Sequence, residues 1–165
     1  MPEVALADLV ARARLTELVA EYGNLIDWID WGRLDAVFWP EAKFDFGMFK
    51  GNFEEYRGFV AQLEESYARR LHMFAIPAIT LADEYARIAA GSVIVCRTDD
   101  PAPGIDDTFW GRYLFEAECR KGEWRLSSLT YVLNLFDRAE RATDDRTGPM
   151  NFGDGLSPKH PFATR

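Results

Sequence analysis

The chain has 165 residues, and its 27 acidic and 19 basic side chains give a formal net charge of −8. That length predicts one domain with its own core and room for an internal pocket. The acidic balance argues against nucleic acid or an anionic membrane as a partner, because both attract a basic surface. Aromatic residues make up 14% of the chain, and we expect some of them to line a cavity for an apolar ligand.

The two thiols, Cys96 and Cys119, lie far apart in strand-like runs. They suggest neither a zinc cluster nor a disulfide framework, which favours a reducing compartment. The first residues lack the basic start and apolar stretch of a signal peptide, and no apolar run reaches the ~18 residues of a membrane span. We therefore expect a cytoplasmic protein.

The first 70 residues have the spacing of helices. Apolar residues recur at intervals of three and four over 15–29, which predicts an amphipathic helix that begins near Ala5. Asp30 is a candidate cap for a second short helix, which Pro40 would end. A short strand (42–46), a turn (50–52) and a third helix (53–67) are expected to follow.

After Arg70 the runs are rich in β-branched and aromatic residues, which is typical of strands. Lys121-Gly122 is the expected turn of a hairpin. Helices followed by an antiparallel meander predict an α+β domain, in which a strongly curved, mostly antiparallel sheet wraps the helices into a cone. The expected strands are 71–81, 85–97, 108–120 and 124–135.

We place the domain at residues 1–135 and a tail at 136–165, where large apolar side chains are few. Such a tail is either a surface or disordered segment, or a lid or inter-subunit arm. In the second case Phe152, Leu156 and Phe162 would close a pocket or dock on a neighbouring subunit.

The sequence lacks a glycine-rich phosphate loop, a dinucleotide-binding fingerprint, an HExxH motif and a Gly-x-Ser-x-Gly elbow. With two histidines in the chain, we expect no metal site. Chemistry would then depend on ordinary acid and base side chains, which points to proton transfer, elimination, isomerisation or hydration.

Tyr22, Asp27 and His72 are polar where the pattern asks for apolar residues or gives no structural reason for them. The structural alternatives are a core tyrosine, a solvated carboxylate and a satisfied core histidine. If the end of the first helix meets the start of the sheet, Asp27 can fix the tautomer of His72 and make it a general base. Tyr22 can then donate a proton to a leaving oxygen or steady an enolate.

Five short motifs follow one another along the chain: Glu21-Tyr22, Ile26-Asp27-x-x-Asp30-Trp31, Leu71-His72-Met73, Gly111-Arg112-Tyr113 and Gly122-x-Trp124-Arg125-Leu126. Their order resembles the SnoaL-like branch of the nuclear transport factor 2 superfamily, over about residues 5–135. The resemblance implies an α+β cone with a deep pocket, a homodimer or homotrimer, and catalysis without a cofactor.

Within this family, the bile acid dehydratase pattern falls on Tyr22, Asp27 and His72, which the resemblance implies are catalytic. Scytalone dehydratase carries a second pocket histidine and a further tyrosine, at positions where this sequence offers Val93 and Phe46. Phe46 therefore implies a more apolar pocket wall and a substrate other than scytalone.

Arg112 and Tyr113 flank the position where family members present a substrate-binding polar group. Alternation favours Tyr113 on the inner face, with Phe109, Phe115 and Cys119, unless a bulge near Gly111 reverses it. Asn134 is a second candidate for the pocket rim, because it is expected to share its face with Leu126, Thr130 and Val132. The alternative for each is an ordinary sheet side chain.

The expected function is a cofactor-independent lyase that acts by acid-base elimination on a small hydrophobic aromatic or polycyclic compound. One such substrate is a lignin-derived diarylpropane, which would give a stilbene and formaldehyde. A dehydratase, isomerase or cyclase on a steroid-like or polyketide-like compound is the alternative. A non-catalytic subunit of an oxygenase-type assembly is an alternative of another class.

Overall fold

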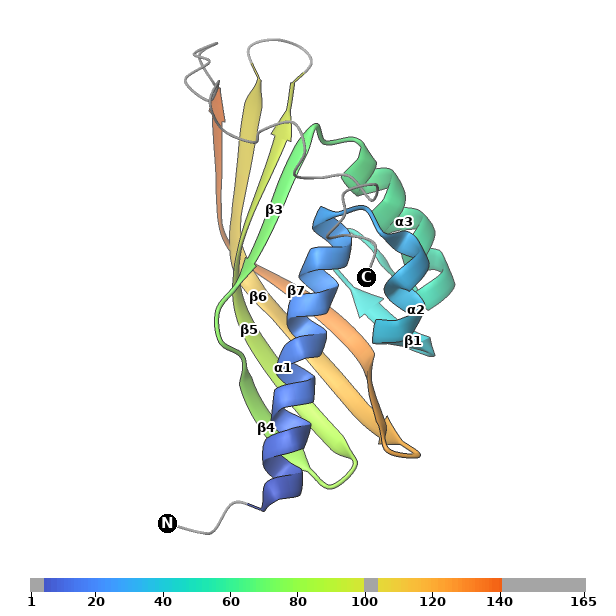
Figure 1. The fold of residues 1–165 in the computed structure, drawn as a ribbon. Helices are drawn as coiled ribbons and strands as arrows, with labels where there is room; N and C mark the ends of the chain where they lie inside the picture. Colours follow the sequence, from blue (N-terminus) through green and yellow to red (C-terminus); the bar gives the residue numbers. More distant parts are fainter. Residues whose placement is uncertain (1–4, 100–103, 141–165) are drawn as a thin grey trace.

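The computed structural model describes residues 5–99 and 104–140 (Figure 1). In chain order the elements are α1 (Leu6–Asp27), a 3-10 turn (Trp31–Arg33), α2 (Leu34–Val37), β1 (Phe38–Asp45), β2 (Lys50–Asn52), α3 (Phe53–Glu65), β3 (Arg69–Phe74), β4 (Ala78–Ala82), β5 (Tyr85–Thr98), β6 (Ile105–Arg120) and β7 (Glu123–Glu140).

The strands form one sheet in the order β2-β1-β7-β6-β5-β3, and β4 pairs with β5 as well. The pairing of β1 with β7 is parallel, while the other pairs are antiparallel. The sheet curves around α1, and α2 and α3 lie on the same side of it (Figure 1). The expected α+β cone is confirmed.

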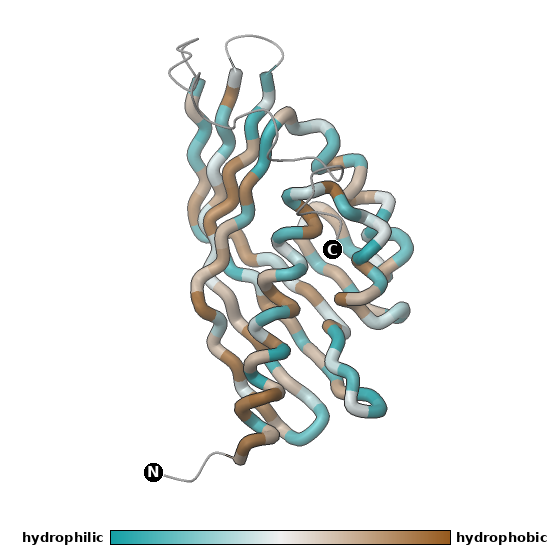
Figure 2. The backbone as a smooth tube through the Cα atoms, viewed as in Figure 1, coloured by the Kyte–Doolittle hydropathy of each residue, from teal (hydrophilic) through white to brown (hydrophobic). Residues whose placement is uncertain are grey.

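Strict alternation along β5 shows how the core is made. Its even-numbered residues from Ala86 to Cys96 are buried, while the odd-numbered ones face outward and are more exposed. Along α1, buried residues from Leu15 to Ile26 face this inner side of the sheet, and hydrophobic residues recur along both elements (Figure 2). The core therefore fills the concave side of the sheet.

The hairpin between β6 and β7 forms at the expected turn. Lys121 and Gly122 have φ values of 55° and 82°, as a two-residue turn that matches the strand twist requires. Arg120 pairs with Glu123 on either side of it.

The second helix is shorter than expected. Asp30 makes no side-chain capping bond, and α2 ends at Val37, where the chain passes directly into β1. Pro40 lies within β1 and does not end a helix. It falls in the irregular stretch between Phe38 and Lys43, where a residue without an N–H costs the sheet no regular hydrogen bond.

Two other expectations for single elements are wrong. Residues 71–81 form two strands, β3 and β4, which are separated at Ala75–Pro77 and both pair with β5. Residues 50–52 are not a turn but strand β2, which pairs with β1. Asn52 then caps α3 in a reciprocal capping box with Glu55.

Strand β7 continues through Phe136 to Glu140, beyond the boundary expected at residue 135. The ring of Phe136 packs on Phe109, with the ring centroids 5.1 Å apart. Residues 141–165, with the proposed contacts of Phe152, Leu156 and Phe162, lie outside the described residues. In the part of the chain that the structure describes, no helix has both the length and the hydropathy to cross a bilayer.

Candidate active site

The end of α1 meets the start of β3 through Asp27 and His72. The ring nitrogen Nδ1 of His72 lies 2.8 Å from Oδ1 of Asp27, and the backbone N–H of His72 donates to both carboxylate oxygens at 3.0 and 2.9 Å. A carboxylate only accepts hydrogen bonds, so Nδ1 carries the proton and Nε2 presents its lone pair. Only 3% of the His72 side chain and 9% of the Asp27 side chain are exposed.

Asp27 sits in the last turn of α1, where the helix dipole disfavours a carboxylate by ~0.3 to 1 kcal/mol. The bonds from His72 compensate for this position. The same bonds tie the helix end to the strand, so the carboxylate orients the imidazole and anchors α1 at once.

Tyr22 lies one turn before Asp27 on the buried face of α1, and its hydroxyl oxygen is 2.7 Å from that of Tyr56 in α3. Burial raises the pKa of both phenols above the ordinary value of 10.0. Both hydroxyls therefore stay protonated at neutral pH, and one of the pair can donate outward while accepting from the other.

Tyr113 points inward, as alternation predicted, and is 2% exposed. Its ring contacts those of Tyr22, Phe74 and Tyr131, with centroids 5.8, 5.0 and 4.8 Å away. Phe46 lies beside the same group, 6.4 Å from Tyr113. The inner face next to His72 is thus largely aromatic, with phenol groups among the rings.

Arg112 is not brought to this cluster, because it is exposed on the outer face of β6. A bulge does occur near Gly111, but the extra residue is Asn134 on β7, so the alternation of β6 is not reversed. Asn134 is exposed.

A second irregularity in β7 explains the error about the face of Asn134. Ala117 pairs with Leu126 and Glu116 with Ser128, so Ser127 is an extra residue that shifts the alternation. As a result Leu129, and not Thr130 or Val132, follows Leu126 onto the buried face.

Ser92 and Tyr131 were not identified from the sequence. Ser92, rather than the neighbouring Val93, faces inward on β5 and is 7% exposed. Its hydroxyl lies beside that of Tyr131, and neither buried oxygen makes a hydrogen bond of good geometry within the described residues. Gly111 makes room for this arrangement, since a Cβ there would lie 2.4 Å from the Tyr131 hydroxyl oxygen.

Glu64 and Arg70 were also missed, because each stands in a charged stretch that suggests a solvated surface. Their side chains are 8% and 3% exposed, and Oε2 of Glu64 lies 3.4 Å from Nε of Arg70. Burial raises the pKa of the Glu64 carboxyl, while His72 and Arg70 act to lower it. Within residues 5–99 and 104–140, no three His, Cys, Asp or Glu side chains gather as a metal site would require.

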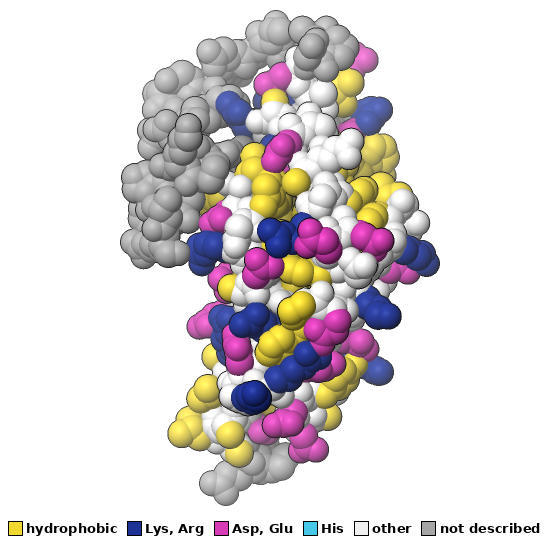
Figure 3. Space-filling view, turned by 90° about the vertical axis from the view of Figure 1, so that its right-hand side faces the viewer, with side chains coloured by type: hydrophobic (Ala, Val, Ile, Leu, Met, Phe, Trp, Pro, Cys, Tyr) yellow, Lys and Arg dark blue, Asp and Glu magenta, His cyan; other side chains and the backbone are white. Residues whose placement is uncertain are grey.

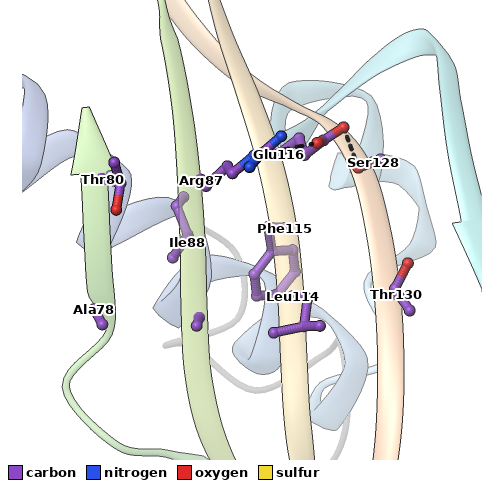
Figure 4. A pocket seen from close by; sticks show the side chains of 10 residues that line it. Ala78, Thr80, Arg87, Ile88, Leu114, Phe115, Glu116, Ser128 and Thr130 are labelled. Carbon is purple, nitrogen blue, oxygen red and sulfur yellow. Dashed lines mark hydrogen bonds and ion pairs between the residues drawn. The ribbon is translucent and has the colours of Figure 1, made fainter. Parts of the chain in front are cut away.

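A groove of about 520 Å³ lies on the opposite, outer face of the sheet, between β4 and β7 (Figure 4). Three of its polar side chains, Arg87, Glu116 and Ser128, interact with one another. Ser128 donates to Glu116 at 3.2 Å, and Nε of Arg87 lies 3.8 Å from the other oxygen of Glu116. The groove is separated from His72 by the sheet itself.

Comparison with solved structures shows the same fold in several proteins. A hexachlorocyclohexane dehydrochlorinase, LinA Type2, superposes with a TM-score of 0.75 at 19% identity, over 83% of this chain and 94% of that one. LinA-type3 from Novosphingobium barchaimii LL02 gives 0.73 at 17% identity, over 81% and 93%. A proposed scytalone dehydratase from Novosphingobium aromaticivorans DSM 12444 gives 0.70 at 14% identity, over 83% and 91%.

None of the curated proteins matches this chain. The SnoaL-like domain matches residues 7–130, which span α1 to β7 and include Tyr22, Asp27 and His72. With most of the chain matched and the NTF2-like cone in place, the chain belongs to the family of SnoaL-like domains.

Proposed function

We propose that this protein is a cofactor-independent lyase that acts by acid-base elimination on a hydroxylated aromatic small molecule. The observation that carries the proposal is the buried His72–Asp27 pair, together with the hydroxyl pair of Tyr22 and Tyr56, in which Tyr22 lies on the same helix as Asp27. An elimination needs a base and a proton donor that act on the same substrate. The names of the similar structures, a dehydrochlorinase and a proposed dehydratase, describe eliminations as well.

In this proposal His72 is the base. Asp27 holds Nδ1–H, so Nε2 takes the proton from the substrate, and the Asp27 carboxylate stabilises the imidazolium that forms. Tyr22 donates to the leaving oxygen, and Tyr56 supports it by donating to the oxygen of Tyr22.

We further propose that the substrate is a diarylpropane 1,3-diol with a para-phenol. The phenol loses its proton to solvent and expels the benzylic hydroxyl, protonated by Tyr22, as water, which leaves a quinone methide. Nε2 of His72 then takes the proton of the remaining primary hydroxyl, and the adjacent carbon–carbon bond breaks to release formaldehyde. The bonding electrons rearomatise the phenol ring and form the stilbene. His72 then returns its proton to Tyr22, and the product phenolate takes one from solvent.

The aromatic inner face supports a substrate with two rings. Phe46 and Tyr113 present ring faces and edges against which such rings can stack, and Phe74 adds a third surface. The phenols of this wall offer hydrogen bonds to ring oxygens without adding charge.

The test is to mix the purified protein with a phenolic diarylpropane diol, with and without EDTA, and to follow stilbene absorbance and formaldehyde. We expect equal amounts of both products, unaffected by EDTA, and none from His72→Ala. A substrate whose phenol is methylated should not react, because it cannot form the quinone methide. No product from a folded wild-type sample would refute this substrate.

A non-catalytic subunit would also give no product, and substitution separates it from an enzyme with another substrate. If the protein is a non-catalytic subunit, the variants His72→Ala and Asp27→Asn should fold and bind the partner as the wild type does. No turnover would then be found in the wild type or in the variants. An isomerase or cyclase would instead lose its turnover on a steroid-like or polyketide-like compound in the same two variants.

We also propose a homodimer or homotrimer in the cytoplasm. The outer face of the sheet exposes large apolar side chains that a second copy could cover: Leu71 and Met73 on β3, Leu114 on β6 and Val132 on β7. On the helical side, acidic and basic side chains are intermixed (Figure 3). The cytoplasmic location rests on the thiols of Cys96 and Cys119, which are both free.

A further inference from the structure

Arg70 and His72 are alternate residues of β3, and both side chains face the concave side of the sheet. The Arg70 guanidinium is fixed by two bonds from Nη2, to the backbone carbonyls of Glu64 at 2.8 Å and Tyr67 at 2.7 Å. Arg70 therefore closes the carboxyl end of α3 and holds one positive charge at a defined place on the face of β3 that also carries His72.

Glu64 supplies the opposite charge. Its Oε2 is 3.4 Å from Nε of Arg70, but neither atom has a hydrogen-bond partner within the described residues. A buried ion pair without such bonds is a poor source of stability, because the desolvation of both charges is not fully offset. The two bonds from Nη2 of Arg70 stabilise the end of α3, but the ion pair with Glu64 adds little stability of its own.

The position of the pair beside the base gives a better reason. Alternate residues of a strand lie on the same face, and charges interact more strongly in a buried site than in water, so a positive charge at Arg70 opposes a second positive charge on the imidazole. The negative charge of Glu64, on α3, acts on the imidazole in the opposite direction.

We propose that Glu64 and Arg70 are positioning residues that set the charge state of the His72 imidazole by opposing electrostatic effects. The functional meaning rests on the proposed function, in which His72 is the base. The electrostatic effect of Glu64 and Arg70 on His72 does not depend on the proposed function, because it can be measured without any substrate.

Other groups around the imidazole do not replace this pair. Asp27 on α1 acts on His72 directly, and Asp107 on β6 is engaged by Arg138 of β7 through two bonds of 2.7 Å. The remaining titratable groups coupled to this cluster are kept neutral by pKa values that burial raises: Tyr22, Tyr56, Tyr67, Cys96 and Tyr113.

The experiment is a proton NMR titration of the imidazole C–H signals of the full chain. The chain has two histidines, His72 and His160, and His160→Gln identifies the signal of His72. Glu64→Gln removes the negative charge and should lower the titration midpoint of His72. Arg70→Gln removes the positive charge and should raise it. The double variant should lie between the two, and Arg70→Lys, which keeps the charge, should stay near the wild type.

Shifts in opposite directions support the proposal, since a merely structural role would disturb both variants alike. Equal midpoints, or shifts of the same sign, would overturn it. If Arg70→Gln does not fold, Glu64→Gln decides alone, because the amide keeps the shape of the side chain. The proposed function fails separately: the midpoints would shift as expected, but no stilbene or formaldehyde would form.

Discussion

The hydroxyl oxygens of Tyr22 and Tyr56 lie 2.7 Å apart, and the two residues are only 2% and 0% exposed. A buried pair of phenols shares one hydrogen bond and leaves one proton to donate. Tyr113 extends this group toward β6, because its ring lies 5.8 Å from that of Tyr22. Ionisation of any member would place a negative charge in a nearly dry environment.

The first prediction concerns alkaline pH. The pKa of Tyr22 is raised in the folded state mainly by burial, so its contribution to stability is complete below 10.0 and is lost as pH rises further, because the unfolded chain then releases the proton first. We expect the free energy of unfolding to fall above pH 10. In Tyr22→Phe the fall should be less steep by about one proton. Urea unfolding of the wild type and Tyr22→Phe at a series of pH values measures this difference. Identical slopes of unfolding free energy against pH in the two proteins would contradict the prediction.

The second prediction concerns Asp27→Asn. The amide can still accept from the backbone N–H of His72, but it no longer stabilises an imidazolium and can favour the wrong tautomer. We expect turnover of the diarylpropane to fall by roughly 100- to 10,000-fold while the protein stays folded. Rate measurements at matched far-UV circular dichroism test this, and near wild-type turnover would rule out Asp27 as the partner of the base.

The third prediction compares two glycines. Gly111→Ala places a Cβ 2.4 Å from the Tyr131 hydroxyl and 2.6 Å from the carbonyl oxygen of Val132, so we expect a loss of ~1 to 3 kcal/mol in stability. Gly58→Ala, in α3, meets no atom within 4 Å and should stabilise by ~0.5 to 1 kcal/mol. Chemical denaturation of both variants measures the two changes in stability. A change in the same direction in both variants would contradict the prediction.

The fourth prediction concerns the outer face of the sheet. Light scattering should give wild-type particles of two or three times 18.8 kDa. Leu114→Glu and Val132→Lys place charges on the apolar surface and should shift the particles toward the monomer. Met48→Glu is a matched control, because Met48 is 72% exposed on the loop between β1 and β2. A monomeric wild type would refute the proposed oligomer.

Local patterns predicted much of this fold. The alternation of β5 is regular over its whole length, and the turn at Lys121-Gly122 has the residues that its φ values require. Tyr113 was placed correctly because β6 has no extra residue that would reverse its pattern. Where a strand is regular, sequence alternation gives the face of a side chain directly.

The errors arose where the chain is irregular. Ser127 and Asn134 are extra residues in β7, and neither is marked by a glycine or proline. Each extra residue changes the face of those that follow it, so alternation counted from Leu126 failed. Pro77 did mark the break between β3 and β4, but the apolar run around it resembled one long strand.

The partners of the site could not be found from spacing. Glu64 and Arg70 meet because α3 turns back onto β3, and nothing in their charged neighbours distinguishes a buried pair from a solvated one. Ser92 was missed for another reason, since the family pattern pointed to Val93, whereas its neighbour Ser92 is the residue that faces inward. The pairing of Glu64 with Arg70 and the inward position of Ser92 both depend on how the elements pack in the folded protein.

The anchoring of α1 by Asp27 limits which residues of this fold can change when a new substrate preference evolves. The same carboxylate orients the imidazole and accepts from a backbone N–H of the edge strand β3, so its loss would affect catalysis and architecture in one step. Natural variation at this position is therefore doubly penalised. A new substrate is more readily acquired through residues such as Phe46, whose replacement reshapes the wall and leaves the helix tied to the sheet.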